Sequence, residues 1–475
     1  MQIPSSGSAA PSNSAAELQL GYLWTIAFVA AMGGLLFGYD WVVIGGAKPF
    51  YEAYFHLTSE ALVGWANSCA LIGCLAGSLL AWPFSDRLGR KKVLVLSALL
   101  FAISSVFTGW AHSFAAFIFW RITGGIAIGL ASNVSPMYIA EISPAAWRGR
   151  LVSLNQLAIV IGILVAQIAN WGIADKVPPG FDRVAMAASW NAQYGWRWMF
   201  TAVAVPALVF LTAAPCIPES PRWLAVNQRS AKAQEVFSRI GGESYARAEL
   251  DAIERSIAAQ HENARWRELI SFPGRRLLLI GAALAVLQQG SGINILFNYA
   301  EEVYRSAGYG VNDILFNIVI TGTTNLLFTL VAMLLVDRLG RRRLMIFGCL
   351  AIGASHLAAS FAYHAHMRGL WVLVLTLCAI ACYAMSLAPI TWVLITEIFP
   401  NRMRASAVSI SVATLWVASF VLTYTFPLLN KSLGTSGAFS VYAGICFAGA
   451  AFVVLFVPET KGRSLEKLEE SAGHH

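Results

Sequence analysis

Charged side chains are scarce in this chain of 475 residues. Only 12% of the residues are Asp, Glu, Lys or Arg, whereas 57% are hydrophobic and the mean hydropathy is +0.62. A typical soluble domain contains about 25% charged residues. So few charges cannot cover the surface of a water-soluble protein of this length, which excludes an ordinary soluble globular domain.

The residues that build disulfides, metal centres and hydrolytic active sites are also few. Most of the seven cysteines fall inside apolar stretches, so they do not indicate a disulfide framework. Cys378 and Cys382 are four residues apart, but neither His nor a carboxylate accompanies them. We therefore predict no metal ion and no other cofactor. The eight histidines are dispersed and no nucleophile–base set is found in the apolar stretches, so we do not expect an enzyme.

Long apolar runs, by contrast, take up most of the chain. About twelve windows are each long and apolar enough to cross about 30 Å of hydrocarbon. Backbone polar groups inside lipid must be satisfied within their own segment, so these windows are predicted to be helices. They lie near residues 22–46, 62–82, 93–111, 114–140, 151–172, 196–214, 276–304, 312–336, 343–362, 370–398, 405–428 and 437–457. The predicted fold class is an all-α membrane protein with twelve transmembrane helices.

Positive charge is concentrated in alternate short loops between these runs. The basic loops are DRLGRKK (86–92), WRGR (147–150), DRLGRRR (337–343) and NRMR (401–404). This distribution follows the positive-inside rule and predicts a multi-pass protein of the cell inner or plasma membrane with both termini in the cytoplasm. The net charge of +8 is thus a topology signal, and we expect no nucleic-acid partner.

Three motifs occur twice in the same order. DRLGR begins at 86 and again at 337, EISP at 141 is matched by EIFP at 397, and PESPR at 218 is matched by PETKGR at 458. Such a repeat predicts two six-helix bundles related by an axis along the membrane normal, with a ligand site between them. The predicted divisions are a disordered tail (1–20), an N-terminal bundle (21–214), a cytoplasmic helical linker (215–275), a C-terminal bundle (276–458) and a second tail (459–475).

Together with FGYD, RITGGIAIG, SPMYIAEISP, SLNQLAI, PESPRWL, QQGSGIN and PETKGRSLE, these motifs resemble the sugar porter family of the major facilitator superfamily. They are most similar to those of the bacterial xylose:proton symporter and the mammalian glucose facilitators. The resemblance runs from about residue 22 to residue 468. It implies the major facilitator fold and transport of a monosaccharide by alternating access.

Asp40 in the first predicted span and Arg121 in the fourth are charged residues well inside apolar runs. Ionisable groups in a membrane almost always pair inside the helix bundle, so we expect these two to meet. The resemblance implies the same pairing and gives it a role in proton coupling. The facilitators of the family carry a neutral residue at the position of Asp40, which favours symport here. The alternative is a static salt bridge between two helices.

Amide side chains and aromatic rings are suited to sugars, which present hydroxyl groups and apolar faces. The seventh span supplies LQQGSGIN, in which glycines loosen the helix beside two glutamines and an asparagine. The resemblance implies that the sugar site comprises Phe37, Gln156, Gln288, Gln289, Asn294, Asn298, Trp392 and Trp416. Two positions depart from the pattern of the xylose symporter, since Leu415 replaces a glutamine and Asn298 an aromatic residue.

Acidic and basic residues at the cytoplasmic ends of the spans form a predicted gate. Its members are Asp86, Arg90, Glu141, Arg148, Glu219 and Arg222 in the first half and Asp337, Arg341, Glu397, Arg404 and Glu459 in the second. The sequence therefore predicts a proton-coupled monosaccharide symporter whose partners are a sugar, a proton and the lipid bilayer, acting as a monomer. The alternatives are a proton-independent sugar facilitator, an inositol or polyol porter and a non-transporting sugar sensor.

Overall fold

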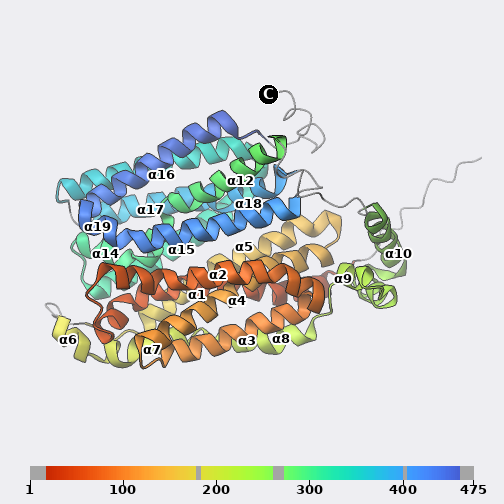
Figure 1. Cartoon of the computed structure of the whole chain (residues 1–475), viewed down its shortest axis with the longest axis horizontal. Helices are drawn as coiled ribbons and strands as arrows, with labels where there is room; N and C mark the ends of the chain where they lie inside the picture. Colours follow the sequence, from red (N-terminus) through yellow and green to blue (C-terminus); the bar gives the residue numbers. More distant parts are fainter. Residues whose placement is uncertain (1–17, 178–182, 260–271, 368, 400–403, 460–475) are drawn as a thin grey trace, which may run out of the picture.

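The structure is a computed structural model that describes residues 18–177, 183–259, 272–367, 369–399 and 404–459 (Figure 1). Its helices in the first half are α1 (Leu20–Tyr54), α2 (Glu60–Leu88), α3 (Arg90–Gly109), α4 (Phe114–Ile142), α5 (Ala145–Ile173), α6 (Arg183–Ala188), α7 (Trp196–Thr201) and α8 (Ala204–Ala213). A π-helical turn (Asn191–Gly195) precedes α7 and a 3-10 turn (Ala214–Cys216) follows α8. Two helices follow, α9 (Pro221–Val226) and α10 (Ser230–Ala259). The second half contains α12 (Phe272–Gly290), α13 (Ile293–Asn298), α14 (Ala300–Ser306), α15 (Val311–Leu339), α16 (Arg341–His364), α17 (Leu370–Met385), α18 (Leu387–Glu397) and α19 (Arg404–Phe456).

The apolar runs form the predicted membrane-spanning helices. Within the described residues, 11 helical segments are long and apolar enough to cross a membrane. The last of them, Ser406–Phe456, is 51 residues long, and its backbone leaves the helical conformation at Gly434, where φ is +69°. This glycine divides α19 into two crossings. The resulting twelve crossings agree with the twelve predicted from hydropathy.

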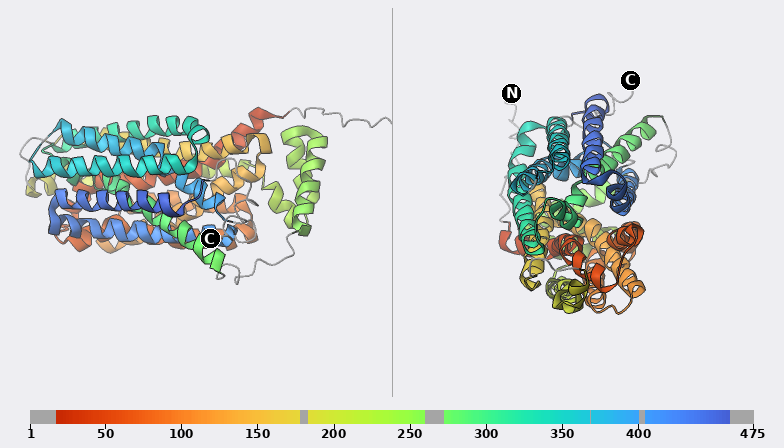
Figure 2. Two further views of the ribbon diagram at one scale, coloured as in Figure 1. Left: turned by 90° about the horizontal axis from the view of Figure 1, so that it is seen from above. Right: turned by 90° about the vertical axis from the view of Figure 1, so that its left-hand side faces the viewer.

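The helices of each half pack together, and the two halves lie side by side (Figure 1 and Figure 2). Helix α1 packs on α5 and α2 on α4 in the first half, whereas α16 and α12 both pack on α19 in the second. The halves meet where α2 packs on α19, α5 on α15, and α1 on α13 and α14. These helices therefore form much of the boundary between the halves. The exact division of the chain into domains stays a prediction.

Helices α9 and α10 lie beyond one end of the helix bundles, which we call the linker end (Figure 1). The opposite end, where α6 and the connections from α1 to α2 and from α14 to α15 lie, is called the far end. Helix α10 is kinked at Gly241 and Gly242. Helices are thus present in the predicted linker, and the part of it formed by residues 260–271 lies outside the described residues.

Two spans of the second half are broken, the first of them twice. Helix α12 ends at Gly290 and α13 begins at Ile293, with Gly292 between them at φ +79°. A further break at Tyr299 separates α13 from α14, and Ser386 separates α17 from α18. Breaks of this kind free backbone groups inside the membrane, which is tolerated where the backbone lines a cavity or finds other partners.

Candidate functional site

The two charges predicted to pair do meet in the structure. Arg121 of α4 donates from Nη1 to Oδ1 of Asp40 on α1, at 3.0 Å. Both residues are buried, Asp40 at 4% and Arg121 at 3% exposure. A lone carboxylate at this depth would cost about 2.5–3.5 kcal/mol on insertion scales, so the guanidinium offsets that cost.

The other oxygen of the Asp40 carboxylate is not paired. Oδ2 is buried and accepts no hydrogen bond from the described residues. It faces α4 at Gly124, where an added Cβ would lie 3.4 Å away. The Arg121 guanidinium also lies over the ring of Phe200, 5.4 Å from its centroid. The carboxylate thus keeps one oxygen on Arg121 and has a second oxygen that a proton can occupy.

Three of the predicted sugar ligands form one chain of amides at the break between α12 and α13. Asn294 donates to Gln289 Oε1, and Gln289 in turn donates to Gln288 Oε1 at 3.2 Å. Gln288 reaches the carbonyls of Leu387 and Ala388 at 3.4 Å, beyond the break in the neighbouring span. Such side chains donate and accept hydrogen bonds, which suits them to sugar hydroxyls.

The helix break itself is held by His356 of α16, which sequence reasoning missed. Its Nε2 lies 2.8 Å from the carbonyl oxygen of Ser291, an acceptor freed by the break. The imidazole is buried beside the rings of Phe439 and Tyr442. The sequence offered no signal, since a single histidine in an apolar helix has no distinctive neighbours.

Aromatic rings from the two halves meet across the interface. Phe37 and Trp41, one turn apart on α1, lie 6.1 Å from each other and 6.0 Å each from Trp416 of α19. The indole Nε1 of Trp416 donates to Ser78 Oγ of α2 at 2.8 Å. Phe37 and Trp416, both predicted, thus lie together. Trp41 and Ser78 contact them and were not predicted.

The remaining predicted ligands lie on neighbouring helices. Gln156 of α5 and Trp392 of α18 are partly buried, whereas Asn298 is buried at the end of α13 with an unpaired Oδ1. Gln167, one of the buried residues of α5, was not predicted, yet both polar atoms of its amide lack partners and its Oε1 abuts Gly322 of α15. The surface hollow of about 460 Å³ lined by Ala53, His56, His112, Ser113 and Gln193 contains none of these side chains.

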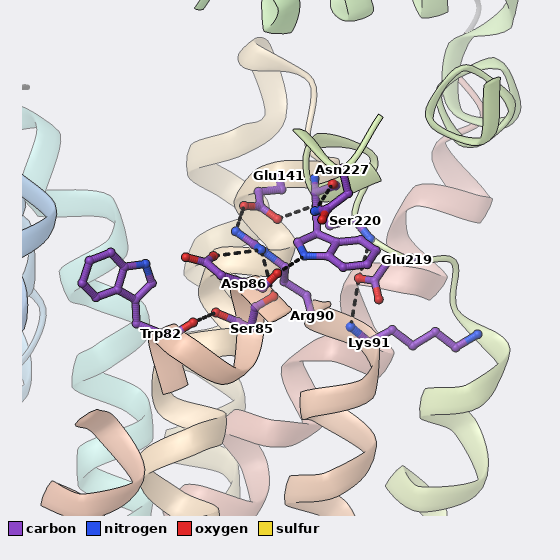
Figure 3. A network of polar contacts seen from close by, with 10 residues as sticks. Trp82, Ser85, Asp86, Arg90, Lys91, Glu141, Glu219, Ser220 and Asn227 are labelled. Carbon is purple, nitrogen blue, oxygen red and sulfur yellow. Dashed lines mark hydrogen bonds and ion pairs between the residues drawn. The ribbon is translucent and has the colours of Figure 1, made fainter. Parts of the chain in front are cut away.

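Polar residues of the first half form a network at the linker end (Figure 3). Arg90 donates to Glu141 at 3.0 Å and to Asp86 at 3.4 Å. Glu219 accepts from the backbone N–H of Lys91 at 3.0 Å, and Ser220 donates to Glu141. The start of α3 is therefore tied both to α4 and to the segment that leads into α9.

The second half repeats this arrangement. Arg341 pairs with Glu397 at 3.5 Å, and Glu459 accepts from the backbone N–H groups of Arg341 and Arg342 at 3.1 and 3.2 Å. Gly89 and Gly340 hold the matching positions before α3 and α16, with φ of +91° and +88°. Each of these ion pairs joins residues of one half.

For four of the predicted gate residues, the described structure gives no ion pair. Arg148 and Arg222 are exposed, and Arg148 reaches the carbonyl of Ser143 at 3.5 Å. The side chains of Asp337 and Arg404 lie outside the described residues.

A comparison with protein families decides the identity of this fold and site. The family described as "Sugar (and other) transporter" matches residues 26–472. The chain belongs to this sugar transporter family.

Similar members of the family match this chain over nearly its whole length. The D-xylose-proton symporter of Escherichia coli (strain K12) is 36% identical over 94% of this chain and 95% of the relative. The glucose transport protein of Synechocystis sp. is 37% identical over 97% and 99%. The arabinose-proton symporter of Bacillus subtilis is 36% identical, covering 95% of each chain.

Solved structures of the xylose transporter XylE from E. coli have the same fold. The inward open conformation matches with a TM-score of 0.83 at 35% identity, over 94% of this chain and 99% of that one. The proton:xylose symporter bound to 6-bromo-6-deoxy-D-glucose matches with a TM-score of 0.78, over 95% and 99%. This sugar transporter therefore has the major facilitator fold, as its repeated motifs predict.

Proposed function

We propose that this chain is a proton-coupled monosaccharide symporter that works by alternating access. The observation that carries the proposal is the position of Asp40 on α1. The same helix presents Asp40 to Arg121 in its own half and Phe37 and Trp41 to Trp416 in the other. A change in how the halves meet therefore acts on the proton site and the aromatic cluster together.

The proton acts by changing the charge of the Asp40–Arg121 pair. When Asp40 is ionised, the pair holds α1 against α4 by a charge-assisted hydrogen bond. A proton on Oδ2 removes the carboxylate charge and weakens that bond. If the halves rock and wet the carboxyl from alternate sides, Asp40 takes up the proton from one side and releases it to the other.

The sugar acts at the interface of the halves. The chain of amides on α12 and α13 offers donors and acceptors, and the rings of Phe37, Trp41 and Trp416 offer apolar faces. The xylose, arabinose and galactose proton symporters among the relatives support a pentose or a hexose as substrate. Leu415 in place of a glutamine argues for a selectivity unlike that of the xylose symporter.

The linker-end networks act as the gate on the cytoplasmic side. The basic loops 86–92 and 337–343 lie at this end, so the proposal orients it and both termini toward the cytoplasm. It also includes a monomer as the transporting unit.

Replacing Asp40 tests the coupling. In proteoliposomes with an imposed proton gradient, the native chain should accumulate labelled sugar, and Asp40→Asn should lose accumulation but still exchange sugar across the membrane. Asp251→Asn, at an exposed position of α10, serves as the matched control. Exchange by Asp40→Asn shows that the variant is folded.

Accumulation by Asp40→Asn at the native level would contradict the proposal. Equal uptake by the native chain with and without the gradient would instead indicate a facilitator. A thermal-shift screen against xylose, arabinose, glucose, galactose and inositol identifies the sugar used in these assays.

A further inference from the structure

Five charged side chains cluster at the far end, where sequence reasoning predicted no site. We call Lys48, Glu52, Glu301, Glu302 and Arg305 the outer charge cluster. The Nζ atom of Lys48 lies 2.8 Å from Glu52 Oε1 and 3.6 Å from Glu301 Oε2, and it contacts Glu302 more closely. Arg305 contacts the other oxygen of Glu301. The side chains of Lys48 and Glu301 are 2% and 3% exposed, so the centre of the cluster is withdrawn from water, whereas Arg305 is exposed.

The cluster bridges the two halves of the molecule. Lys48 and Glu52 belong to α1, whereas the other three residues belong to α14. The backbones meet close by, since a Cβ added to Gly45 would lie 2.4 Å from the carbonyl oxygen of Phe297. The contacts of Lys48 with Glu301 and Glu302 exist only while α1 touches α14. They must break whenever the far end opens, which is the movement that the proposed transport cycle requires.

The charges of the cluster do not balance. Its three carboxylates face two cations, and the ion pairs of these carboxylates within the described residues are those to Lys48 and Arg305. The Oε2 atom of Glu302 is buried without a hydrogen-bond partner. Burying an uncompensated charge is costly, and a proton bound to one carboxylate removes it.

The surrounding titratable groups do not supply the missing positive charge. The ring of Tyr299 lies 5.6 Å from Lys48 Nζ, and Tyr51 beside it has a buried hydroxyl without a partner. Arg121 of α4 interacts electrostatically with Tyr51, but its ion pair is with Asp40. The excess negative charge therefore belongs to the three carboxylates.

We propose that the outer charge cluster is a second proton-binding site, which takes up a proton as the far end closes. The inference rests on the proposed function for the closing movement. When α1 and α14 separate, water reaches the carboxylates and the proton returns to the side from which it came. The cluster thus moves no proton across the membrane. It makes closure of the far end more favourable as the solution on that side becomes more acidic.

Distances between spin labels at the far end test this site. Labels at Thr58 and Asp313, exposed positions in the two halves, report opening in a background without the seven cysteines. The background also carries Asp40→Asn, so that the first proton site does not contribute. From about pH 8 to about pH 5, the closed fraction should rise, by at most about tenfold per pH unit in the closed-to-open ratio for one proton.

Two variants and a control identify the groups involved. Glu302→Gln removes the excess charge, so the closed state should dominate and the pH dependence should vanish. Lys48→Met leaves three carboxylates with one cation, so the open fraction should increase at every pH. Glu60→Gln, at the start of α2 on the same end, should keep the unmodified pH dependence.

Three results would overturn the proposal. They are the same pH dependence in Glu302→Gln as in its parent, no pH dependence in the parent, and an unchanging distance in all variants. Sugar uptake by the native chain is measured separately. It distinguishes failure of the second proton-binding site from failure of the proposed transport function. A chain that moves no sugar but shows the expected titration would contradict the transport proposal alone.

Discussion

At the scale of single residues, rarity made Asp40 and Arg121 predictable. Few charged residues lie deep in the apolar runs, and each needs a partner there, so a pair was expected. The two side chains lie 3.0 Å apart. Uncharged residues carry no such signal. Trp41, Ser78 and His356 are ordinary members of membrane helices, and only the packing of helices far apart in the sequence brings them to the site.

Gln288→Ala tests the amide chain. The substitution leaves Gln289 without its acceptor and removes a donor and an acceptor for sugar. Sugar affinity should fall by about 1–3 kcal/mol, the cost of buried polar groups left without partners. Binding to purified protein, followed by calorimetry, measures the change. Gln234→Ala, in the linker helix α10, should bind like the native chain, and unchanged affinity in Gln288→Ala would remove the seventh span from the site.

At the scale of helices, hydropathy predicted where the spans lie. It did not predict which helices pack together or where they break. Two Gly-x-x-x-Gly pairs press α2 and α4 together so closely that any added Cβ would lie 2.0–2.3 Å from a backbone carbonyl of the facing helix. The four glycines are Gly73, Gly77, Gly125 and Gly129. Such small-residue faces allow membrane helices to approach without side chains between them. The breaks at Tyr299 and Ser386 also went unpredicted, because no glycine marks them.

Gly125→Val is expected to destabilise the first half. Its side chain would collide with the carbonyl of Ala70, and overpacking of this kind costs about 1–3 kcal/mol or more. The melting temperature in detergent should fall. Gly444→Val is the matched control, because this glycine of α19 has open space where its Cβ would be. Equal melting temperatures for the two variants would show that α2 and α4 separate freely.

At the scale of the whole molecule, the repeated motifs predicted two halves with matching linker-end networks. Both networks are present, with Glu219 at the start of α3 and Glu459 at the start of α16. The charges that join the halves at the far end were not predicted. Lys48 lies just beyond the first apolar window, and nothing in the sequence places it beside residues more than two hundred positions away.

Arg90→Gln tests whether the linker-end network biases the transport cycle. Partly exposed ion pairs contribute about 0–1 kcal/mol each, so losing the pairs to Asp86 and Glu141 should change the ratio of the two states by only a fewfold. Label distances at the far end measure that ratio, and the rate of sugar exchange should change while equilibrium sugar affinity does not. Arg255→Gln, exposed on α10, is the control. A complete loss of exchange in Arg90→Gln would contradict this small bias and would mean that the ion pairs of Arg90 are required for the structure.

The proton pair and the chain of amides stand on opposite sides of the contact between the halves. Asp40 and Arg121 belong to α1 and α4, whereas Gln288, Gln289 and Asn294 belong to α12 and α13. On the proposed function, selection can therefore alter the amides, and with them sugar recognition, without changing the residues that couple uptake to protons. Chimeras that exchange the second half between relatives should therefore shift toward the sugar preference of the protein that supplies the second half. They should keep the proton coupling of the protein that supplies the first.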